Sequence, residues 1–425
     1  MTRRLVLLFA VCVAAVVGAC REQLDSGAAC PALCPAQSIG IRDTILSPVL
    51  VFDSTFIGYP ARGQESAILL ATQGDTLETR GVVRFDSLVV TYSPGGTAQS
   101  ITAVDSSRVR IVLDRTKSTI PAQVRFEVYD VDDTTAADTS AAAVLTLFRA
   151  NRRIGQRTVL RDSLTDTLFV PLSDSAVLRK ITNNLHLRLG IRVDGTGPVS
   201  LHMQTVETGN SALVYYHPTT TDTTVRTIVV SPISSSPAGV LTPEIRTDLQ
   251  DFMLVAKYAV PLATNTMSVG GVPGRRVYLR FNVPRYLTDS TTVIRASLRL
   301  TQSPLPFGIA GDTMTINAHV VLAGPLVTDL RQATSIIAAP GLQVLDSLLV
   351  SPRDSGVRVF EMYGLLRAWG SQASLLYPPP HAVVLRSVLE GVSSSEIRFF
   401  STNAPAAVRP TMVISYIPKT QFGIP

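Results

Sequence analysis

The sequence predicts a mainly β protein built from two tandem β-sandwich domains of jelly-roll style, each with one or two short helices. Three observations predict this class: short runs that alternate apolar and polar residues, turn sequences rich in glycine and proline between them, and an internal repeat. The chain has 425 residues, of which 46% are hydrophobic and 16% charged, so it can bury a sizeable core. This length, about twice that of a usual domain, favours two large domains.

The first 19 residues have the layout of a secretory signal: Arg3 and Arg4, an apolar run from Leu5 to Val17, and small residues. This run is shorter than the roughly 20 apolar residues that span a bilayer as a helix. The next feature, Val-Gly-Ala-Cys at 17–20, resembles a bacterial lipobox. That resemblance implies cleavage before Cys20, acylation of its thiol with palmitate-type chains, and attachment to the membrane. The alternative is an ordinary signal peptide with an incidental cysteine.

Residues 20–42 are expected to be a flexible tether between the lipid anchor and the folded part. Within it, Cys30 and Cys34 are close enough in sequence to form a local disulfide in an oxidising compartment. Arg21 follows the lipobox cysteine, and the absence of aspartate there favours the outer membrane in bacteria that have two membranes. The predicted location is therefore the cell envelope.

Period-two patterns place one face of each strand in a core. Residues 108–113 put three apolar side chains on one face and two arginines with a valine on the other, and residues 294–301 alternate in the same way. The apolar faces comprise Val109, Ile111 and Leu113 in the first run and Ile294, Ala296, Leu298 and Leu300 in the second. Helical patterns occur at 174–184 and 360–370.

Four pairs of segments repeat in the same order at nearly one offset. Phe85 of VVRFDSL matches Phe281 of YLRFNVP at an offset of 281 − 85 = 196, and the segments 199–218 and 395–418 end on prolines 418 − 218 = 200 residues apart. We therefore expect one module used twice, at 43–218 and 244–418. The Thr-, Ser- and Pro-rich residues 219–243 are expected to form the linker.

The second copy resembles the DNRLRE-type module, a jelly-roll domain of secreted bacterial proteins grouped with carbohydrate-binding modules. The resemblance rests on LRF at 279–281, ASLRL at 296–300, Trp369, and RPTMVISY at 409–416, and it covers about residues 244–418. The first copy lacks the Arg-Pro pair and the tryptophan, so its membership depends on the internal repeat. This resemblance implies that the modules bind polysaccharide.

No motif of an enzyme is present. There is no G-x-S-x-G elbow, and the five histidines have neither H-E-x-x-H nor H-x-x-x-H spacing, so we expect no catalytic site. The acidic residues Asp130, Asp132 and Asp133 could supply oxygen ligands to a structural calcium, although a solvated loop is the other interpretation. No other metal or cofactor is expected. A net charge of +6 that is spread along the chain does not favour nucleic acid as a partner.

Aromatic side chains decide whether a surface can hold sugar, because their rings stack on the apolar faces of pyranoses. Tyr377, before three prolines, is the best exposed candidate, and Trp369 is either a second candidate or a core residue. The pairs Tyr215-Tyr216 and Phe399-Phe400 should each place one ring inside and one outside. We expect a non-catalytic envelope lipoprotein that binds polysaccharide. The alternative is an assembly or adhesion lipoprotein that binds protein partners: two exposed rings on a concave sheet would favour sugar, and flat polar faces would favour assembly.

Overall fold

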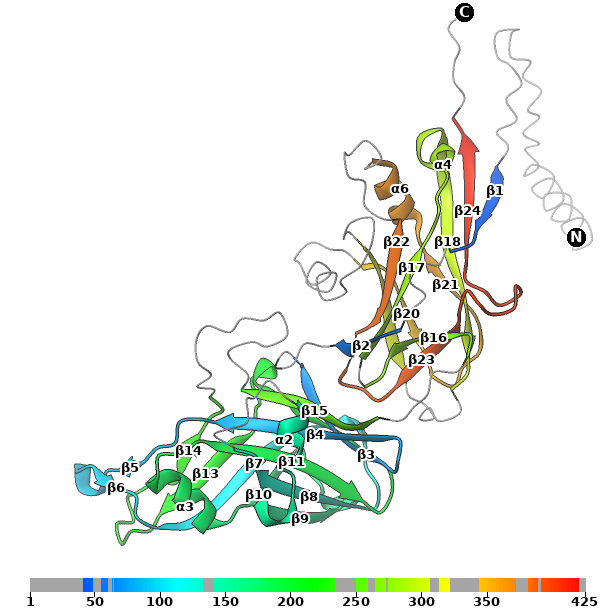
Figure 1. Ribbon diagram of the computed structural model, residues 1–425. Coiled ribbons are helices and arrows are strands. Elements are labelled where there is room, and N and C mark those ends of the chain that lie inside the picture. Colours follow the sequence, from blue (N-terminus) through cyan, green and yellow to red (C-terminus); the bar gives the residue numbers. More distant parts are fainter. Residues whose placement is uncertain are drawn as a thin grey trace, which may run out of the picture. The chain divides into compact units, whose positions relative to one another are not determined.

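The chain forms two antiparallel sheets of 11 strands each, which confirms the predicted mainly β fold (Figure 1). The structure, a computed structural model, describes residues 41–48, 55–59, 63, 65–132, 141–233, 250–258, 264–272, 274–305, 313–321, 344–371, 381–388 and 391–419. In the described parts no helix is long and apolar enough to cross a membrane.

The first sheet has the strand order β14-β13-β7-β12-β3-β4-β11-β8-β9, with β10 paired to β7 and β15 paired to β4. Its strands are β3 (Ala67–Gln73), β4 (Leu77–Phe85), β7 (Val104–Thr119), β8 (Gln123–Asp130), β9 (Arg153–Leu160), β10 (Thr167–Pro171), β11 (Leu187–Gly195), β12 (Val199–Gln204), β13 (Leu213–Pro218), β14 (Ile228–Val230) and β15 (Asp251–Tyr258). Between them lie the hairpin β5 (Thr91–Tyr92) and β6 (Gln99–Ser100), the helices α2 (Ala141–Leu145) and α3 (Asp174–Thr182), and the 3-10 turns η1 (Pro94–Gly96), η2 (Ala150–Arg152), η3 (Arg161–Ser163) and η4 (Val206–Thr208). We call this sheet with its helices the first module.

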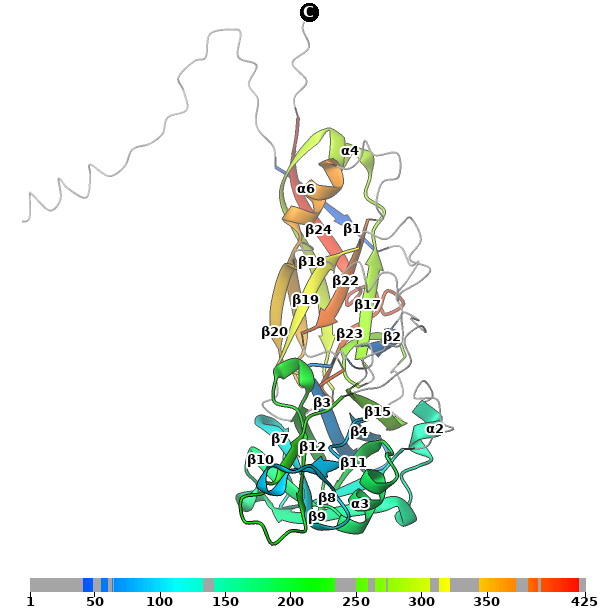
Figure 2. The same cartoon turned by 90° about the vertical axis from the view of Figure 1, so that its left-hand side faces the viewer.

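The second sheet has the order β1-β24-β18-β23-β16-β17-β22-β19-β20, with β21 paired to β18 and β2 paired to β17. Its strands are β1 (Arg42–Leu46), β2 (Thr55–Tyr59), β16 (Thr266–Gly270), β17 (Gly274–Arg280), β18 (Thr291–Ser303), β19 (Met314–Val320), β20 (Val344–Val350), β21 (Gly356–Glu361), β22 (Ala382–Ser387), β23 (Glu396–Phe400) and β24 (Thr411–Pro418). The helices α4 (Arg285–Asp289) and α6 (Tyr363–Ser371) belong to this second module (Figure 2).

The two sheets have the same topology, strand for strand. In the order given above, each strand of the first sheet has a counterpart at the same place in the second. This holds also for the strands outside the main path, since β10 corresponds to β21 and β15 corresponds to β2. The helices also correspond, since α3 precedes β11 and α6 precedes β22. This identity of strand order supports the internal repeat found in the sequence.

Strand pairing crosses the predicted module boundaries. The strands β1 and β2 precede the first module in the chain but lie in the second sheet, while β14 and β15 follow most of the first module and complete the first sheet. The alternation of apolar and polar residues indicates which face of a strand is buried, but it does not identify the neighbouring strand. For this reason the sequence placed residues 43–59 with the first module and 244–258 with the second.

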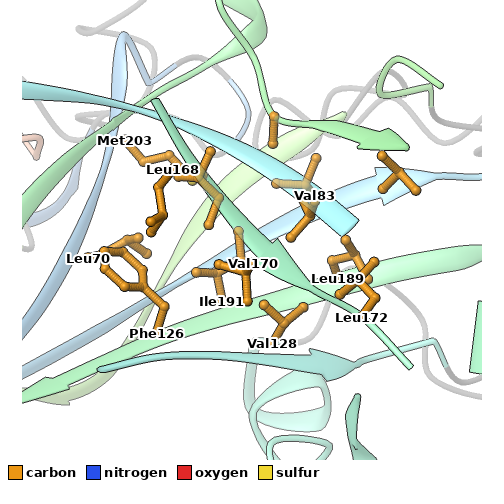
Figure 3. Close-up of a cluster of buried hydrophobic side chains, with 14 of the residues drawn as sticks. Leu70, Val83, Phe126, Val128, Leu168, Val170, Leu172, Leu189, Ile191 and Met203 are labelled. Atoms are coloured by element: carbon orange, nitrogen blue, oxygen red, sulfur yellow. The ribbon is translucent and has the colours of Figure 1, made fainter. Parts of the chain in front are cut away.

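Each module has its own hydrophobic core. The core of the first contains Val109, Ile111 and Leu113 of β7, as predicted, packed against residues of the facing strands, of which Figure 3 shows a part. The core of the second contains Ala296, Leu298 and Leu300 of β18. The prediction was wrong for Ile294, which is 44% exposed, because a bulge between Val293 and Arg295 shifts the register of β18 against β24.

The helices form near the places predicted from the sequence. In α3 the Ser173 side chain caps the helix by accepting a hydrogen bond from the backbone N–H of Ala176, while Val177 and Ile181 are buried. The helix expected at 360–370 begins later than predicted: Phe360 still belongs to β21, with its side chain in the core, and α6 starts at Tyr363. The strand continues to Glu361 because its backbone pairs with Ser297 of β18.

Candidate functional site

The lipidation and disulfide candidates Cys20, Cys30 and Cys34 lie outside the described residues, as does the sugar-binding candidate Tyr377. Trp369 is described and is 1% exposed, in the core of the second module. Its ring lies 4.8 Å from that of His381. Because the indole is shielded from solvent, Trp369 is a core residue and does not serve as a ligand platform.

The calcium candidates Asp130 and Asp132 are buried and bind a protein cation. The ammonium of Lys180 lies 3.0 Å from a carboxylate oxygen of Asp130 and 2.9 Å from one of Asp132. In addition, Arg152 donates to the backbone carbonyls of both aspartates. Asp133 lies outside the described residues, and within those residues no group of three or more His, Cys, Asp or Glu side chains could hold a metal ion.

This ion pair continues into a buried network beside the end of β4. The carboxylate of Asp86 is fully buried and binds Arg84 at 2.7 Å and Arg188 at 3.0 Å. A carboxylate oxygen of Asp132 lies 3.7 Å from the same Arg188 guanidinium and so connects the two groups. The network thus places Asp86, Asp130 and Asp132 against Arg84, Arg188 and Lys180. Since each of these carboxylates has a cationic partner within the protein, we interpret it as a structural network that holds α3 on the first sheet.

Two further titratable groups are buried with perturbed pKa values. Burial raises the pKa of Asp251 to about 7, against a hydrogen bond from the backbone N–H of Val206, and Glu65 and Glu207 raise it further. Burial and the nearby Arg386 and Arg276 lower the pKa of His319 to about 4. Neither group forms part of a nucleophile–base arrangement that the structure displays.

The strongest candidate for a binding surface is a group of three side chains on the outward face of the first sheet, Arg108, Phe169 and Tyr215, which we call the aromatic patch. Their strands β10, β7 and β13 lie side by side, and the registers pair Phe169 with Arg110 and Tyr215 with Arg108. Because side chains alternate between the faces of a strand, Leu168, Val170 and Tyr216 enter the core while their neighbours point outward.

The three side chains of the aromatic patch stack on one another. The guanidinium carbon of Arg108 lies 4.5 Å from the ring centroid of Phe169 and 5.5 Å from that of Tyr215. The two rings are 5.8 Å apart, edge to face at 71°. Phe169 and Tyr215 are half-buried and Arg108 is exposed. The patch therefore presents apolar ring surface beside guanidinium donors to the solvent.

Two more arginines border the patch. Arg157 donates a hydrogen bond of 2.5 Å to the backbone carbonyl of Phe169, and Arg110 donates to the carbonyl of Ser211 at 3.4 Å. These bonds hold the two guanidinium groups at the backbone of Phe169 and of Ser211, close in sequence to the two rings. With Arg108, three arginines therefore lie in or next to the patch, which favours an anionic ligand.

The corresponding positions of the second module lack aromatic rings. There, Ser415 pairs with Arg295 as Tyr215 pairs with Arg108, and Glu361 pairs with Ser297 as Phe169 pairs with Arg110. A salt bridge of 2.7 Å joins Arg295 to Glu361, and its hydrogen bond lowers the pKa of Glu361. This surface is of the polar kind that the sequence analysis connected with assembly.

A second aromatic pair lies elsewhere in the second module. Tyr286 of α4 and Tyr416 of β24 have ring centroids 6.0 Å apart, and Tyr286 is 44% exposed. Among the described residues no guanidinium is stacked on this pair, so it makes a useful control for the aromatic patch.

Sequence reasoning recognised part of the aromatic patch. The rule that adjacent rings point to opposite faces holds for Tyr215 and Tyr216 and for Phe399 and Phe400. Phe169 was missed, although it stands between the inward residues of the run TLFVP at 167–171, which marks it as an outward ring. Its proximity to Tyr215 follows from the pairing of two strands with β7, which the sequence does not reveal.

Comparisons with known proteins give no family. No family model matches the chain, and no curated protein matches it. Among solved structures, the chain is similar to PNGase F, a glycosylasparaginase from Flavobacterium meningosepticum, with 11% identity, a TM-score of 0.20, and coverage of 86% of this chain and 96% of that one. It is also similar to the tandem CBM22 domains of Paenibacillus barcinonensis Xyn10C, with 8% identity, a TM-score of 0.14, and coverage of 88% and 99%. These scores are too low to carry an argument about function.

Proposed function

We propose that the chain is a non-catalytic lipoprotein of the bacterial cell envelope, anchored through Cys20, whose first module binds polysaccharide at the aromatic patch. The observation that carries the proposal is the stack of Arg108 on Phe169 and Tyr215 at the outward face of the sheet. Ring faces stack on the C–H surfaces of pyranoses, and guanidinium groups donate hydrogen bonds to hydroxyl and carboxylate oxygens.

The arginines around the patch favour an acidic polysaccharide. Arg108 stacks on the two rings, while Arg110 and Arg157 are bonded to backbone carbonyls of Ser211 and Phe169. A guanidinium can bind the carboxylate of a uronic acid with two parallel hydrogen bonds. A neutral glucan would use the rings but leave these charges without partners. We therefore expect uronate-containing chains to bind more tightly than neutral ones.

The test is a glycan-array screen of the soluble fragment from Gln37, which retains every described residue. The array carries alginate, pectate, dextran and cellulose fragments, and the wild type is compared with the Phe169→Ala/Tyr215→Ala variant. We expect the wild type to bind the acidic chains and the variant to lose that binding, while Tyr286→Ala and Tyr377→Ala retain it. Absence of binding to every polysaccharide would contradict the proposal and leave the assembly role ahead.

The anchoring part of the proposal has a separate test. Cys20→Ala should leave the precursor uncut at residue 19 and remove its acylation, which is read by labelling with an alkyne-bearing palmitate. A variant that is still processed and membrane-bound would contradict the lipobox interpretation and would leave the binding proposal unaffected.

The assembly alternative is supported by the second module. Its surface at Arg295, Glu361 and Ser415 is polar, and Ile45 and Val357 of the same sheet are 66% and 59% exposed. Partners of this module would be proteins.

A further inference from the structure

The strands β1 and β2 and the strands β14 and β15 occupy corresponding places in opposite modules; we call the chain segments that carry them, 42–59 and 228–258, the exchange segments. The first contains β1 and β2 and completes the second sheet, and the second contains β14 and β15 and completes the first sheet. Each exchange segment directly precedes the β3 or β16 strand of its own repeat. Each repeat therefore begins with two strands that it contributes to the sheet of the other repeat.

The inner strands of the exchange segments dock in the same register. Phe281 matches Phe85 at an offset of 196, and the same offset relates the strand partners of β15 and β2. The pairs Arg80–Leu254, Thr79–Val255 and Glu78–Lys257 in the first sheet correspond to Arg276–Phe56, Arg275–Ile57 and Gly274–Tyr59 in the second. Both registers shift at the same step, where one residue of the docked strand is skipped. Such agreement extends the repeat to residues that the sequence comparison did not reach.

The outer strands agree as well. Tyr216 pairs with Ile228 of β14, and Tyr416, which lies 200 positions later, pairs with Arg42 of β1. The next pairs along each strand follow in step. The outer strands β14 and β1 therefore pair in the same register with equivalent strands of the two sheets. The inner strands β15 and β2 do so as well. Reciprocal exchange of this kind is the geometry by which two copies of a domain swap an element.

We propose that the exchange segment 42–59 also docks on the second module of another copy of the chain, so that two chains associate by swapping this segment. The partner is thus a second copy of the protein. The pairs formed between chains would be those seen within one chain, from Arg42–Tyr416 to Leu46–Met412 along β24 and from Thr55–Val277 to Tyr59–Gly274 along β17.

The exchange segment 228–258 is held too firmly to swap. Phe252 and Leu254 of β15 are 1% exposed and pack with Tyr129, Val144 and other residues in a separate buried cluster. The carboxylate of Asp251 accepts a hydrogen bond from the backbone N–H of Val206, and that of Glu65 accepts one from Met253. Release of this segment would expose all of these groups.

Of the exchange segment 42–59, the strand β1 has side chains that are held more weakly. In β1 the side chains of Arg42, Asp43 and Ile45 are exposed, and Leu46 alone packs partly against the core of the second module. The segment lies before the rest of the first module in the chain, so its release moves no other strand. Segments with few buried contacts open at low free-energy cost.

Protein concentration then decides between the monomer, in which the segment docks within its own chain, and the dimer, in which two chains exchange it. The same residues pair in both forms, so their free energies differ mainly through the effective concentration that a covalent connection imposes within one chain, which is on the order of millimolar for short linkers. A lipid anchor would concentrate chains on a membrane. That last point rests on the proposed anchoring, whereas the test below needs neither lipid nor sugar.

The test uses the soluble fragment from Gln37, which contains none of the four cysteines of the chain, at positions 12, 20, 30 and 34. One preparation carries Ile45→Cys and another carries Val413→Cys, since these positions are register partners across β1 and β24. Paired residues of neighbouring strands have Cα atoms about 4.5–5.5 Å apart, which suits a disulfide. Both side chains lie at least partly at the surface, so both variants should fold, as checked by circular dichroism.

The two preparations are mixed in denaturant, refolded together at about 1 mM, and oxidised. We expect a disulfide-linked dimer from Ile45→Cys with Val413→Cys, at least fivefold more abundant than from Ile45→Cys with Val357→Cys, an exposed position on β21 that does not pair with β1. Light scattering of the wild-type fragment refolded at the same concentration should show dimer. The double variant Ile45→Cys/Val413→Cys, refolded at micromolar concentration, should give crosslinked monomer. If Ile45→Cys with Val413→Cys forms no more dimer than Ile45→Cys with Val357→Cys, the proposed exchange between chains is wrong.

Discussion

Arg108 and Arg295 occupy the same register position in the two modules, but Arg108 stacks on Phe169 and Arg295 pairs with Glu361. One arginine thus presents a flat cation beside apolar rings, and the other is neutralised by a carboxylate. The two modules share the same strand order and differ at two neighbours of that arginine, which are Phe169 and Tyr215 in the first and Glu361 and Ser415 in the second. This difference makes the first module the expected site of sugar binding.

Replacement Arg108→Lys should weaken binding of acidic polysaccharide about tenfold. An ammonium keeps the charge but loses the planar stack and the two parallel donors of the guanidinium. The change is read as a Kd from calorimetric titration. Arg295→Lys, at the equivalent position of the second module, is the matched control and should leave the Kd unchanged. Equal weakening by both variants would contradict the assignment to the first module.

The Glu361→Phe/Ser415→Tyr variant should give the second module an aromatic patch of its own. The substitutions place two rings where Phe169 and Tyr215 stand relative to Arg108, and they free Arg295 from its salt bridge. Calorimetry with a short uronate oligosaccharide should then show about twice the number of sites per chain. A stoichiometry that stays at the wild-type value in a folded variant would show that the three side chains are insufficient for binding.

Lys180→Met should destabilise the first module by about 3–5 kcal/mol, because it leaves the buried carboxylates of Asp130 and Asp132 without their ammonium partner. Arg179→Met, on the same helix, removes a side chain that is 62% exposed and 3.7 Å from Asp130, so it should cost less than about 1 kcal/mol. Urea unfolding followed by circular dichroism measures both. A similar effect of the two changes would mean that the buried network carries little free energy.

The stability of the first module should fall as the pH rises from about 4 to above 7. The pKa of Asp251 is about 7 in the folded chain and near 3.8 when unfolded, so between these values the folded state keeps a proton that the unfolded state has released. The free energy of unfolding therefore decreases across this window, by at most about 4 kcal/mol. In Asp251→Asn this decrease should be absent, and the variant should exceed the wild type in melting temperature at pH 8. Parallel pH profiles of the two proteins would exclude the raised pKa.

The strand order of the two sheets agrees with the internal repeat, while several strands pair across the boundaries that the sequence predicted. The alternation at Val109, Ile111 and Leu113 marks a buried face because that pattern is local to one strand. The pairing of β1 with β24 joins residues about 370 positions apart, as Arg42 and Tyr416 show, and no local pattern carries that information. The offset of 196 residues between Phe85 and Phe281 was visible, since core positions of a repeat retain their type. The correspondence between the exchange segments was missed because they pair with their sheets in the same register but have no similar sequence.

The candidate sites show the same limit. Asp130 and Asp132 look like oxygen ligands in the sequence, but their partner Lys180 lies 48 residues away on α3. Trp369 was considered as both a core and a binding residue, and its burial decides for the core. Phe169 and Tyr215 meet only because β10 and β13 both pair with β7. Contacts between strands of distant segments are what the sequence alone could not supply.

The Kd of the soluble fragment for an acidic polysaccharide, measured by calorimetry for the wild type and for Phe169→Ala/Tyr215→Ala, tests the proposed function most directly. Loss of two stacked rings should cost about 2–3 kcal/mol, which corresponds to a Kd raised roughly 30- to 150-fold. The control Tyr286→Ala removes the exposed ring of the Tyr286–Tyr416 pair and should bind like the wild type. Equal Kd values for the wild type and the double variant would contradict sugar binding at the aromatic patch.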